Sequence, residues 1–350
     1  MPRRSLHIGA LEITETAPPL VIAEIGINHG GSLAIAKEIV DSAKKAGAQC
    51  VKHQTHIVDD EMSHLARDVK PGNADISIYE IMKNCALSES EEYELMRYIE
   101  ERGMVFLSTP FSRAAADRLR SFNVSAYKIG SGECNNHPLI EYVALFGKPM
   151  IVSTGMNDIV SVKKTVAILE YFRVEYALLH TTNLYPTPAH LVRLGAMIEL
   201  AQTFPDILFG LSDHTVNNNA CLAATALGAS ILERHFTDTK QRVGPDIVCS
   251  MDEDDLRALL KDSSEVSIMR GGQKVPAPEE AVTMNFALAT VVTLCDIKKG
   301  EVFDKHNIWV KRPGLGEIPA TRYREILGKT STASIPAGSH LTAAMIMDGL

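Results

Sequence analysis

Eight short apolar runs alternate with longer helical patterns between residues 20 and 269. The runs are continuously apolar, as in PMIVST at 149–154 and YALLHT at 176–181, which is typical of parallel strands covered on both faces. We predict strands at Leu20–Ile27, Cys50–Thr55, Val105–Pro110, Ala126–Ser131, Pro149–Thr154, Tyr176–Thr181, Ile207–Leu211 and Ile231–His235. Eight strand–helix units in about 250 residues predict an α/β fold of the (β/α)8 TIM-barrel type. A doubly wound sheet is the alternative, because a sequence does not show whether the sheet closes.

Capping residues and turn signals place a helix after each strand. Ser32 begins a helix that Gly47 ends, and Ser88 with Glu91 forms a capping box before a helix that ends at Gly103. The other predicted helices are 112–122, 138–146, 159–172, 189–204, 217–227 and 252–269. The connection between the second and third strands is much longer than its neighbours, which indicates a functional loop.

The pattern changes at residue 271, where the segment GGQKVPAPEEA is rich in glycine and proline. Short strand-like runs with turn signals follow it, as in VVTLCDIKKGEVF and TASIPAGSHLT. We therefore predict a catalytic barrel at 1–270, in which residues 1–19 form a hairpin that caps the lower end. A linker at 271–285 and a small β-rich domain at 286–350 complete the predicted organisation.

Charge and cysteine usage exclude several classes of protein. The chain has 35 Lys and Arg against 43 Asp and Glu, a net charge of −8, and no basic tract, so nucleic acid and membranes are poor candidate partners. It has no run of 18 apolar residues, and its start, MPRRSLHIGA, lacks the apolar segment of a secretory signal. The six cysteines form no CxxC pair, which favours reduced thiols and a cytoplasmic protein.

Polar and ionisable side chains end every predicted strand, where barrel enzymes gather their catalytic residues. Lys52 and Lys128 supply positive charge there, and an unpaired buried lysine is costly, so their placement favours an anion site. Hydroxyl groups end other strands at the same predicted rim, namely those of Thr109, Ser131, Ser153 and Ser212. Each serine taken alone fits a turn or a helix cap better than a ligand contact.

Two histidines, His214 and His235, end the seventh and eighth strands, which are neighbours in a barrel. Two imidazoles with oxygen partners and open positions suit Mn²⁺ or a similar divalent ion, and the alternative is one structural and one hydrogen-bonding histidine. Four carboxylates are candidates for proton transfer or for binding sugar hydroxyls, with structural ion pairs as the alternative: Glu24, Glu133, Glu233 and Asp246. The residues alone therefore predict a divalent-metal barrel enzyme that binds an anionic, phosphorylated substrate together with a polyol.

Ten joined motifs resemble those of the N-acetylneuraminate (sialic acid) synthase family over nearly the whole chain. They are EIGINHGG, KHQTH, PGNADIS, STPFS, YKIGSGECNN, IVSTGM, TTNLYPTP, GLSDHT, ERHFT and GPDIVCSM. The C-terminal segment is similar to the family's appended domain, which resembles type III antifreeze proteins (a SAF-type domain). KHQTH looks most like the bacterial N-acetylneuraminate synthases, because relatives that make other nonulosonic acids more often carry an aromatic residue where this chain has His53.

The resemblance implies condensation of phosphoenolpyruvate with N-acetylmannosamine and water to give N-acetylneuraminate and phosphate. It implies that His214 and His235 hold a divalent metal ion, foremost Mn²⁺, with Mg²⁺ or Co²⁺ as alternatives. It implies catalytic roles for Glu24, Asp246, Lys52, Lys128 and Arg312, with Glu24 and Asp246 in proton transfer. The substrate-binding residues that it implies are Gln54, Asn73, Thr109, Ser131, Glu133, Ser153, Asn183, Tyr185, Ser212, Glu233 and Phe286. It also implies a domain-swapped homodimer.

Three alternatives remain at this point. A synthase of legionaminic acid type would run the same chemistry on a diacetamido sugar. Synthases that use a sugar phosphate as acceptor would need a further basic cluster, and the sequence has none to spare. A C-terminal ice-binding module on an inactive barrel is disfavoured, because KRPGLGE and DIKKGE put charge at the predicted turns.

Overall fold

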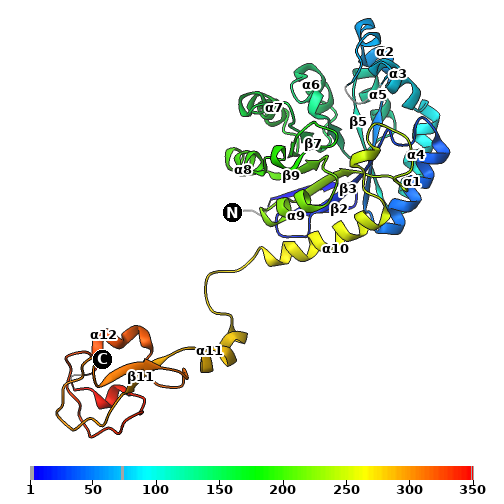
Figure 1. Ribbon diagram of the computed structural model, residues 1–350. Helices are drawn as coiled ribbons and strands as arrows, with labels where there is room; N and C mark the ends of the chain where they lie inside the picture. The colour runs from blue at the N-terminus through cyan, green and yellow to red at the C-terminus, as the bar shows by residue number, and fades with distance from the viewer. Residues whose placement is uncertain (1–3, 72–74, 348, 350) are drawn as a thin grey trace. The chain divides into compact units, whose positions relative to one another are not determined.

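The computed structural model describes residues 4–71, 75–347 and 349. The chain divides into two compact units, Met1–Gly271 and Gly272–Leu350, and each has a hydrophobic core of its own (Figure 1). All six cysteines are free thiols. Within the described residues, none of the helices combines the length and apolarity needed to cross a lipid bilayer.

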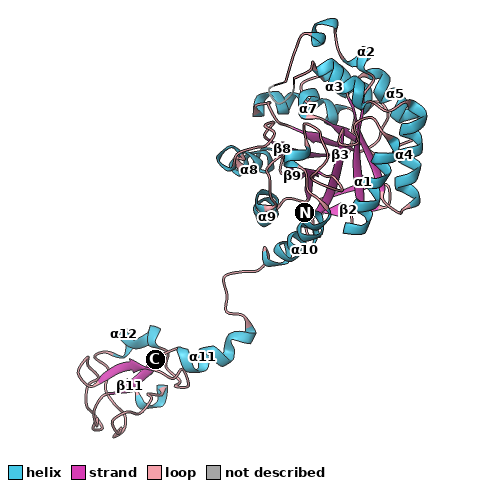
Figure 2. Cartoon of the chain, turned by 45° about the vertical axis from the view of Figure 1, so that its right-hand side comes forward, coloured by secondary structure: helices cyan, strands magenta, loops and turns pink. Residues whose placement is uncertain are grey.

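Met1–Gly271 is built on a closed barrel of eight parallel strands. The strands are β3 (Leu20–Gly26), β4 (Cys50–Thr55), β5 (Val105–Pro110), β6 (Tyr127–Ile129), β7 (Met150–Ser153), β8 (Tyr176–Thr181), β9 (Leu208–Asp213) and β10 (Ile231–His235). The last strand, β10, pairs with β3 and closes the sheet, with His235 beside Glu24 in the register. Figure 2 shows strands of the barrel enclosed by helices. Closure confirms the predicted (β/α)8 barrel and excludes the doubly wound alternative.

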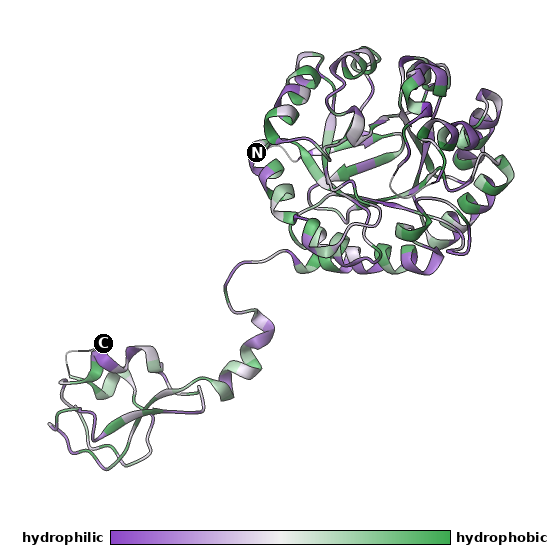
Figure 3. Cartoon of the chain, turned by 45° about the horizontal axis from the view of Figure 1, so that its top comes forward, coloured by the Kyte–Doolittle hydropathy of each residue, from purple (hydrophilic) through white to green (hydrophobic). Residues whose placement is uncertain are grey.

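Helices follow the strands and cover the outside of the barrel (Figure 3). They are α1 (Leu33–Ala46), α4 (Glu89–Glu101), α5 (Arg113–Ser121), α6 (His137–Ala144), α7 (Ile159–Tyr171), α8 (Leu194–Thr203), α9 (Asn219–Ala226) and α10 (Glu253–Met269). The predicted caps are present: the Ser32 side chain accepts from the Ile35 amide, and Gly47 adopts the left-handed conformation. The capping box of Ser88 and Glu91 is also formed.

One prediction about helices was wrong, and the long connection after β4 holds helices that were not predicted. That connection contains α2 (Val58–Glu61), the 3₁₀ turn η1 (His64–Arg67) and α3 (Ile78–Cys85) ahead of α4. The helix expected at 189–204 is broken into the 3₁₀ turn η3 (Ala189–Leu191) and α8. Arg193 causes the break, since its φ of 51° lies in the left-handed region and cannot continue a right-handed helix.

A hairpin of β1 (Ser5–Ile8) and β2 (Leu11–Thr14) lies before the barrel, where the sequence predicted one. Its apolar side chains belong to the same core cluster as the residues at the amino ends of the barrel strands: Leu6, Ile8, Ile13, Leu20, Ile22, Cys50, Leu107, Ile151, Leu179 and Ile231. The hairpin therefore closes the lower end of the barrel with apolar packing. The short 3₁₀ turns η2 (Ser131–Glu133) and η4 (Ile247–Cys249) lie in the connections at the other end.

Gly272–Leu350 is a small unit with little regular structure. It contains the 3₁₀ turn η5 (Pro278–Glu280), α11 (Ala281–Ala287), β11 (Thr290–Thr293), β12 (Ile308–Lys311), η6 (Ala320–Arg322), α12 (Tyr323–Ile326) and η7 (Ala343–Met345). Part of the segment expected as a linker is thus helical. Antiparallel β11 and β12 and several isolated bridges surround a core that includes Val291, Phe303 and Ile335. Trp309, half exposed on β12, meets Tyr323 edge to face with ring centroids 5.3 Å apart.

Candidate active site

A cavity of about 120 Å³ lies at the carboxyl-terminal rim of the barrel. Successive residues of a strand point to opposite faces, so residues two apart, such as Lys52 and Gln54 on β4, both face the interior. The predicted residues that line the cavity are Glu24, Lys52, Gln54, Thr109, Lys128, Ser131, Ser153, Asn183, Tyr185, Ser212, His214, Glu233 and His235. The rule that barrel chemistry gathers at strand ends therefore located most of the cavity wall.

Two lysines and two glutamates form a buried charge cluster on one side of this cavity. Lys52 Nζ lies 2.5 Å from Glu24 Oε2 and 3.8 Å from Glu233 Oε1, and Lys128 Nζ lies 3.5 Å from the same Glu233 oxygen. Burial raises the pKa of Glu24 to about 7 and lowers the pKa of Lys128 to about 8. Burial alone would raise the pKa of Glu233, but Lys128 and Lys52 hold it below its ordinary value. The cluster can bind an anion with two ammonium groups.

Hydroxyl and amide groups complete the wall beside the lysines. Lys128 Nζ donates to Ser153 Oγ at 2.7 Å, and Lys52 Nζ donates to Thr109 Oγ1 at 3.3 Å. The amide of Gly155 donates to Ser131 Oγ at 3.1 Å, and a Cβ at Gly155 would lie 1.8 Å from Asn183 Oδ1, so a larger residue would displace that side chain. Asn183 Oδ1 is buried without a hydrogen-bond partner in the part of the chain that the structure describes. Buried polar groups normally have partners, so this amide is available to a ligand.

The two histidines face each other on the other side, with ring centroids 5.5 Å apart. His214 Nδ1 donates to the Thr182 carbonyl at 2.9 Å, which leaves the Nε2 lone pair free. Burial lowers the pKa of His214 to about 4 and that of His235 to about 3, so both imidazoles are neutral at pH 7, the form that binds metal. Tyr185 stacks on His214 with centroids 4.1 Å apart and holds its ring in place.

This donor set fits a divalent ion with open coordination positions. His235 Nδ1 is buried, has no hydrogen-bond partner within the described ranges and lies 3.7 Å from Asp246 Oδ2. Among residues 4–71, 75–347 and 349, no three His, Cys, Asp or Glu side chains gather into a group that would enclose a metal on its own. Two neutral imidazoles would therefore leave positions for substrate and water oxygens, as in catalytic metal sites.

The remaining predicted residues lie outside the lining of this cavity. Asp246 lies next to His235 with 14% of its side chain exposed, and partial burial raises its pKa to about 6. Glu133 sits on η2, half-buried, and burial raises its pKa. Asn73 lies outside the described residues. Arg312 and Phe286 are exposed on the small unit. The Gly314 amide donates to the Asn285 carbonyl at 2.7 Å and so joins the two segments that carry them. The roles of Arg312 and Phe286 stay predictions.

The orientation of His53 corrects one argument about the sugar substrate. His53 lies between the inward-facing Lys52 and Gln54, so it points outward into the helix layer. Its ring is buried, stacks on His29 with centroids 5.3 Å apart, and has Nδ1 3.2 Å from Glu92 Oε1 on α4. His53 therefore does not line the cavity and cannot choose between sugars by direct contact.

Four further residues line the cavity but were not among the predicted site residues, namely Thr181, Phe111 and the glycines Gly130 and Gly132. Thr181 ends β8 with its hydroxyl buried and without a partner in the described chain, and Phe111 directly follows β5. Both stand at strand ends, so the same positional signal marked them. They were missed because an aromatic ring and a lone threonine have no chemistry that singles them out in a sequence.

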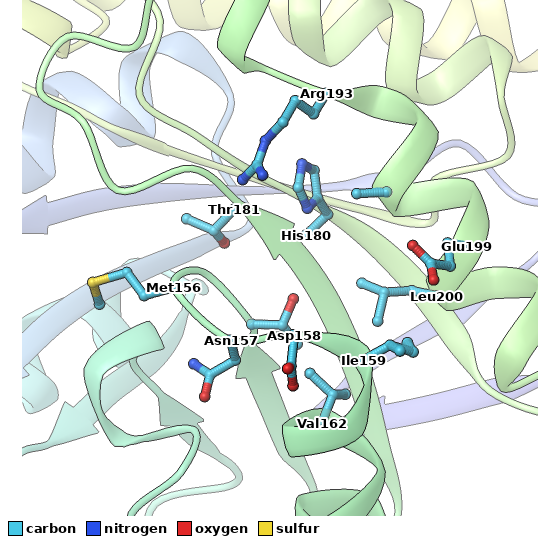
Figure 4. Close-up of a pocket in the computed structure, with 12 residues that line it drawn as sticks. Met156, Asn157, Asp158, Ile159, Val162, His180, Thr181, Arg193, Glu199 and Leu200 are labelled. Atoms are coloured by element: carbon cyan, nitrogen blue, oxygen red, sulfur yellow. The ribbon is translucent and has the colours of Figure 1, made fainter.

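A second cavity of about 520 Å³ opens between α7 and α8, outside the barrel wall (Figure 4). Arg193, Glu199 and the outward-facing His180 of β8 line it, and Thr181 borders both cavities. His180 Nε2 donates to the Val192 carbonyl at 2.7 Å, so this ring is held as part of the wall. Neither of the rim lysines and neither of the paired histidines reaches this cavity, so the smaller cavity is the candidate active site.

Comparison with known proteins identifies the family of the chain. Residues 39–275 match the NeuB family model, and residues 289–347 match the SAF domain model. The chain is 39% identical over 324 residues to an uncharacterized protein of Methanocaldococcus jannaschii, covering 92% of each chain. It is 35% identical over 321 residues to the N,N'-diacetyllegionaminic acid synthase of Campylobacter jejuni, covering 89% of this chain and 96% of that one.

Among solved structures, the chain resembles an N-acetylneuraminic acid (sialic acid) synthetase from Leptospira borgpetersenii in complex with citrate. The TM-score is 0.74 at 25% sequence identity, with 81% of this chain and 95% of that chain covered. The family model covers most of the barrel, and the two curated relatives extend along nearly the whole chain. The chain belongs to the NeuB family.

Proposed function

We propose that the protein is a synthase that joins phosphoenolpyruvate to open-chain N-acetylmannosamine and water and releases N-acetylneuraminate and inorganic phosphate. One observation carries the proposal: two buried lysines and two neutral histidines line the same small cavity at the rim of one barrel. The lysines suit a three-carbon enol phosphate, and the histidines suit a metal ion beside it.

The lysine side of the cavity matches the charges of phosphoenolpyruvate. Its carboxylate and phosphate need cationic and hydroxyl donors, which two hydrogen-bonded pairs supply, Lys52 with Thr109 and Lys128 with Ser153. The cavity of about 120 Å³ is smaller than the ~300–1,000 Å³ of sites that enclose drug-sized ligands. It therefore suits a three-carbon substrate at the bottom, with the larger sugar bound toward the opening.

His214 and His235 would hold a divalent ion, which we propose to be Mn²⁺, with Mg²⁺ or Co²⁺ as alternatives. When bound, such an ion supplies Lewis-acid polarisation of an aldehyde oxygen. The lysines then hold the enol phosphate so that its alkene carbon faces the aldehyde carbon, which fixes the face of attack.

After that attack, carboxylates stabilise the positive charge that forms and transfer the protons. Bond formation leaves positive charge at the enol carbon, next to the carboxylates of Glu24 and Glu233. Water adds to that carbon, and Glu24 takes one of its protons. The proton of the new hydroxyl then passes to the departing phosphate as the C–O bond breaks, which leaves a ketone. Asp246, beside His235, is placed to exchange a proton with the sugar. We propose that Gln54, Asn73, Glu133 and Glu233 bind sugar hydroxyls.

A second acceptor is favoured by one specific finding. The Campylobacter jejuni relative, which matches most of this chain, is an N,N'-diacetyllegionaminic acid synthase. The same chemistry on a 2,4-diacetamido sugar is therefore the second candidate function.

Phosphate release tests both candidates. Purified protein is incubated with phosphoenolpyruvate and either 2-acetamido or 2,4-diacetamido sugar, with chelator and with chelator followed by Mn²⁺. We expect release that needs the enol phosphate, a sugar and the metal, and the ratio of kcat/KM values identifies the acceptor. Release without any sugar, or full activity in chelator, would contradict the proposal. His214→Gln, with exposed His190→Gln as its matched control, should abolish the response to Mn²⁺.

A further inference from the structure

Arg234 on β10 is a buried arginine that the proposed reaction does not use, with 2% of its surface exposed. It stands between Glu233 and His235, which both line the cavity. Because successive residues of a strand point to opposite faces, the Arg234 side chain points outward, behind the barrel wall. A charged group in such a place is costly unless its donors are paired, so the partners of Arg234 show what it does.

The guanidinium of Arg234 is surrounded by acceptors from two connections at the carboxyl-terminal rim. Its Nε lies 3.2 Å from Asp213 Oδ2, and its Nη1 donates to Asn218 Oδ1 at 2.5 Å. Its Nη2 donates to the Thr215 carbonyl at 2.6 Å and to the Cys249 carbonyl at 3.4 Å. The first three partners lie at the end of β9 or directly after it, whereas Cys249 lies on η4, after β10. One side chain therefore joins the two connections.

The connection after β9 carries His214. Asp213 Oδ1 accepts the Thr215 amide at 3.0 Å, and Asp213 Oδ2 accepts the Thr215 hydroxyl at 2.8 Å, so these two residues form a tight turn around His214. The imidazole of His214 is itself held by the Thr182 carbonyl, which accepts from Nδ1 at 2.9 Å. Arg234 contacts the residue on each side of His214 and so fixes the turn that presents it.

The connection after β10 carries Asp246. The Cys249 amide donates to the Asp246 carbonyl at 3.2 Å, and Ser250 Oγ donates to the same carbonyl at 2.8 Å. Cys249 and Asp246 therefore belong to one short turn, and Asp246 Oδ2 lies 3.7 Å from His235 Nδ1. Through the Cys249 carbonyl, Arg234 holds the turn that places this carboxylate beside His235.

The shape of a guanidinium suits these contacts. Arginine presents five N–H donors in a rigid planar fork, whereas lysine carries one compact ammonium group on a flexible stem. Asp213 balances the charge of Arg234, so the pair adds no net charge behind the histidines. A lysine at this position would keep the contact with Asp213 but would not span Asn218, Thr215 and Cys249 at the same time.

We propose that Arg234 is a positioning residue for the metal ion, because it joins the two connections that place His214 and Asp246 around His235. The inference rests on the proposed function, in which the two histidines hold a divalent ion. Neither Arg234 nor Asp213 lines the cavity, so they act on the ion only through the residues beside them. Loss of such an outer partner typically weakens metal binding by roughly 10–100-fold.

Metal binding measured without turnover tests this inference. Mn²⁺ alone is titrated into chelator-treated wild-type protein and into Arg234→Lys by calorimetry, and phosphoenolpyruvate is titrated separately into the metal-free proteins. We expect Arg234→Lys to bind Mn²⁺ about tenfold more weakly. Its affinity for phosphoenolpyruvate should stay within about twofold of the wild type, because both lysines keep their charge and their contacts. Equal Mn²⁺ affinity overturns this inference alone, whereas absence of Mn²⁺ binding by the wild-type protein overturns it together with the proposed function.

Arg118→Lys on α5 is the matched control. Arg118 is also a largely buried arginine with a carboxylate partner, but its partners, Glu92 and the Leu87 carbonyl, lie in neither connection. The visible absorption bands of bound Co²⁺ depend on the arrangement of its ligands. We expect these bands to change in Arg234→Lys and to stay as in the wild type in Arg118→Lys. An equal loss of Mn²⁺ affinity in the two variants would trace the effect to general destabilisation and overturn the proposal.

A milder variant serves if Arg234→Lys does not fold. Asn218→Ala removes one acceptor of the guanidinium at a half-buried position and leaves Asp213, Thr215 and Cys249 in contact with it. We expect Mn²⁺ to bind about threefold more weakly, a smaller loss than in Arg234→Lys because these three contacts remain. Unchanged Mn²⁺ affinity in a folded Asn218→Ala protein overturns the proposal.

Discussion

Burial changes the acidity of the groups that the proposed reaction uses. The pKa of Glu24 rises to about 7 and that of Asp246 to about 6, while the pKa of Lys128 falls to about 8, in each case chiefly because burial disfavours the charged form. These three groups therefore change charge close to neutral pH. The pH dependence of the activity should therefore come from the titration of these three groups and not from residues on the surface.

Glu24 gives the first prediction. A proton acceptor must be ionised, and its raised pKa means that the ionised fraction falls as the pH drops through about 7, so kcat/KM should fall with it. Glu24→Gln should bind phosphoenolpyruvate with an affinity near that of the wild type but turn over poorly. Calorimetry and phosphate release measure the two properties, and near-normal turnover would remove Glu24 from the mechanism.

Lys128 gives the second prediction. Lys128→Met keeps the length and most of the volume of the side chain but removes the ammonium group that contacts Ser153 and Glu233. We expect kcat/KM for phosphoenolpyruvate to fall about 100-fold, which corresponds to one lost charge-assisted contact of ~3 kcal/mol. Exposed Lys163→Met on α7 is the control. An unchanged KM and kcat would place the anion elsewhere.

Sequence reasoning found the inward-facing residues of the strands but misjudged their outward-facing neighbours. Lys52 and Gln54 could be assigned to the cavity because the strand has a period of two, and the same period places His53 outside it. The resemblance had drawn attention to His53 without regard to this period. The series of side-chain contacts that runs from Glu24 through Gln54 and His56 to Glu61 could not be predicted. It joins β4 to a short helix inside the connection that was expected to be a loop.

At the scale of elements, one buried carboxylate ties three of them together. Glu92 on α4 is 1% exposed and contacts Arg118 of α5 at 3.0 Å and His53 of β4 at 3.2 Å. Burial alone would raise the pKa of Glu92, but its contacts with His53, Thr55 and Arg118 hold it below the ordinary value. This network fixes the outer face of the strand whose inner face carries Lys52.

Removal of this carboxylate gives the third prediction. Glu92→Gln should lower the free energy of unfolding by about 3 kcal/mol, because it leaves Arg118, whose side chain is only 13% exposed, without its counter-charge. Since the pKa of Glu92 is lowered on folding, its ionised form stabilises the protein above the ordinary value of 4.5, and this contribution is lost as the pH falls below it.

Urea unfolding at pH 7 and pH 4 measures both effects. The control is Glu100→Gln on the same helix, whose exposed contact with Arg97 is worth about 0–1 kcal/mol. Equal effects of the two substitutions would show that the Glu92 network adds no more stability than a surface ion pair.

Most helix boundaries followed from local signals, and the exceptions have a physical cause. Ser32, Gly47 and Ser88 act through their own backbone neighbours, so their caps were readable from sequence. The break before α8 depends on the left-handed conformation of Arg193, which no local signal demands of an arginine. The sequence therefore offered no reason to end the helix there.

At the scale of the whole molecule, the two units have separate cores, and they should unfold separately. Trp309, the only tryptophan of the chain, lies in the small unit, so its fluorescence reports that unit while far-ultraviolet circular dichroism is dominated by the barrel. The fourth prediction is that the two signals give different midpoints in urea. The prediction fails if the two signals give the same midpoint in the wild-type protein and circular dichroism gives that midpoint in Trp309→Phe as well. The protein would then unfold as a single cooperative unit.

The hairpin below the barrel has a consequence for the order of events at the other end. Leu6, Ile8 and Ile13 close the lower end of the barrel with apolar side chains, so in the proposed reaction both substrates and products would pass through the carboxyl-terminal rim. In that reaction, phosphate would have to leave Lys52 and Lys128 before the next phosphoenolpyruvate could bind there. Inorganic phosphate should therefore compete with phosphoenolpyruvate. Double-reciprocal plots at several phosphate concentrations should then meet at one point on the 1/v axis.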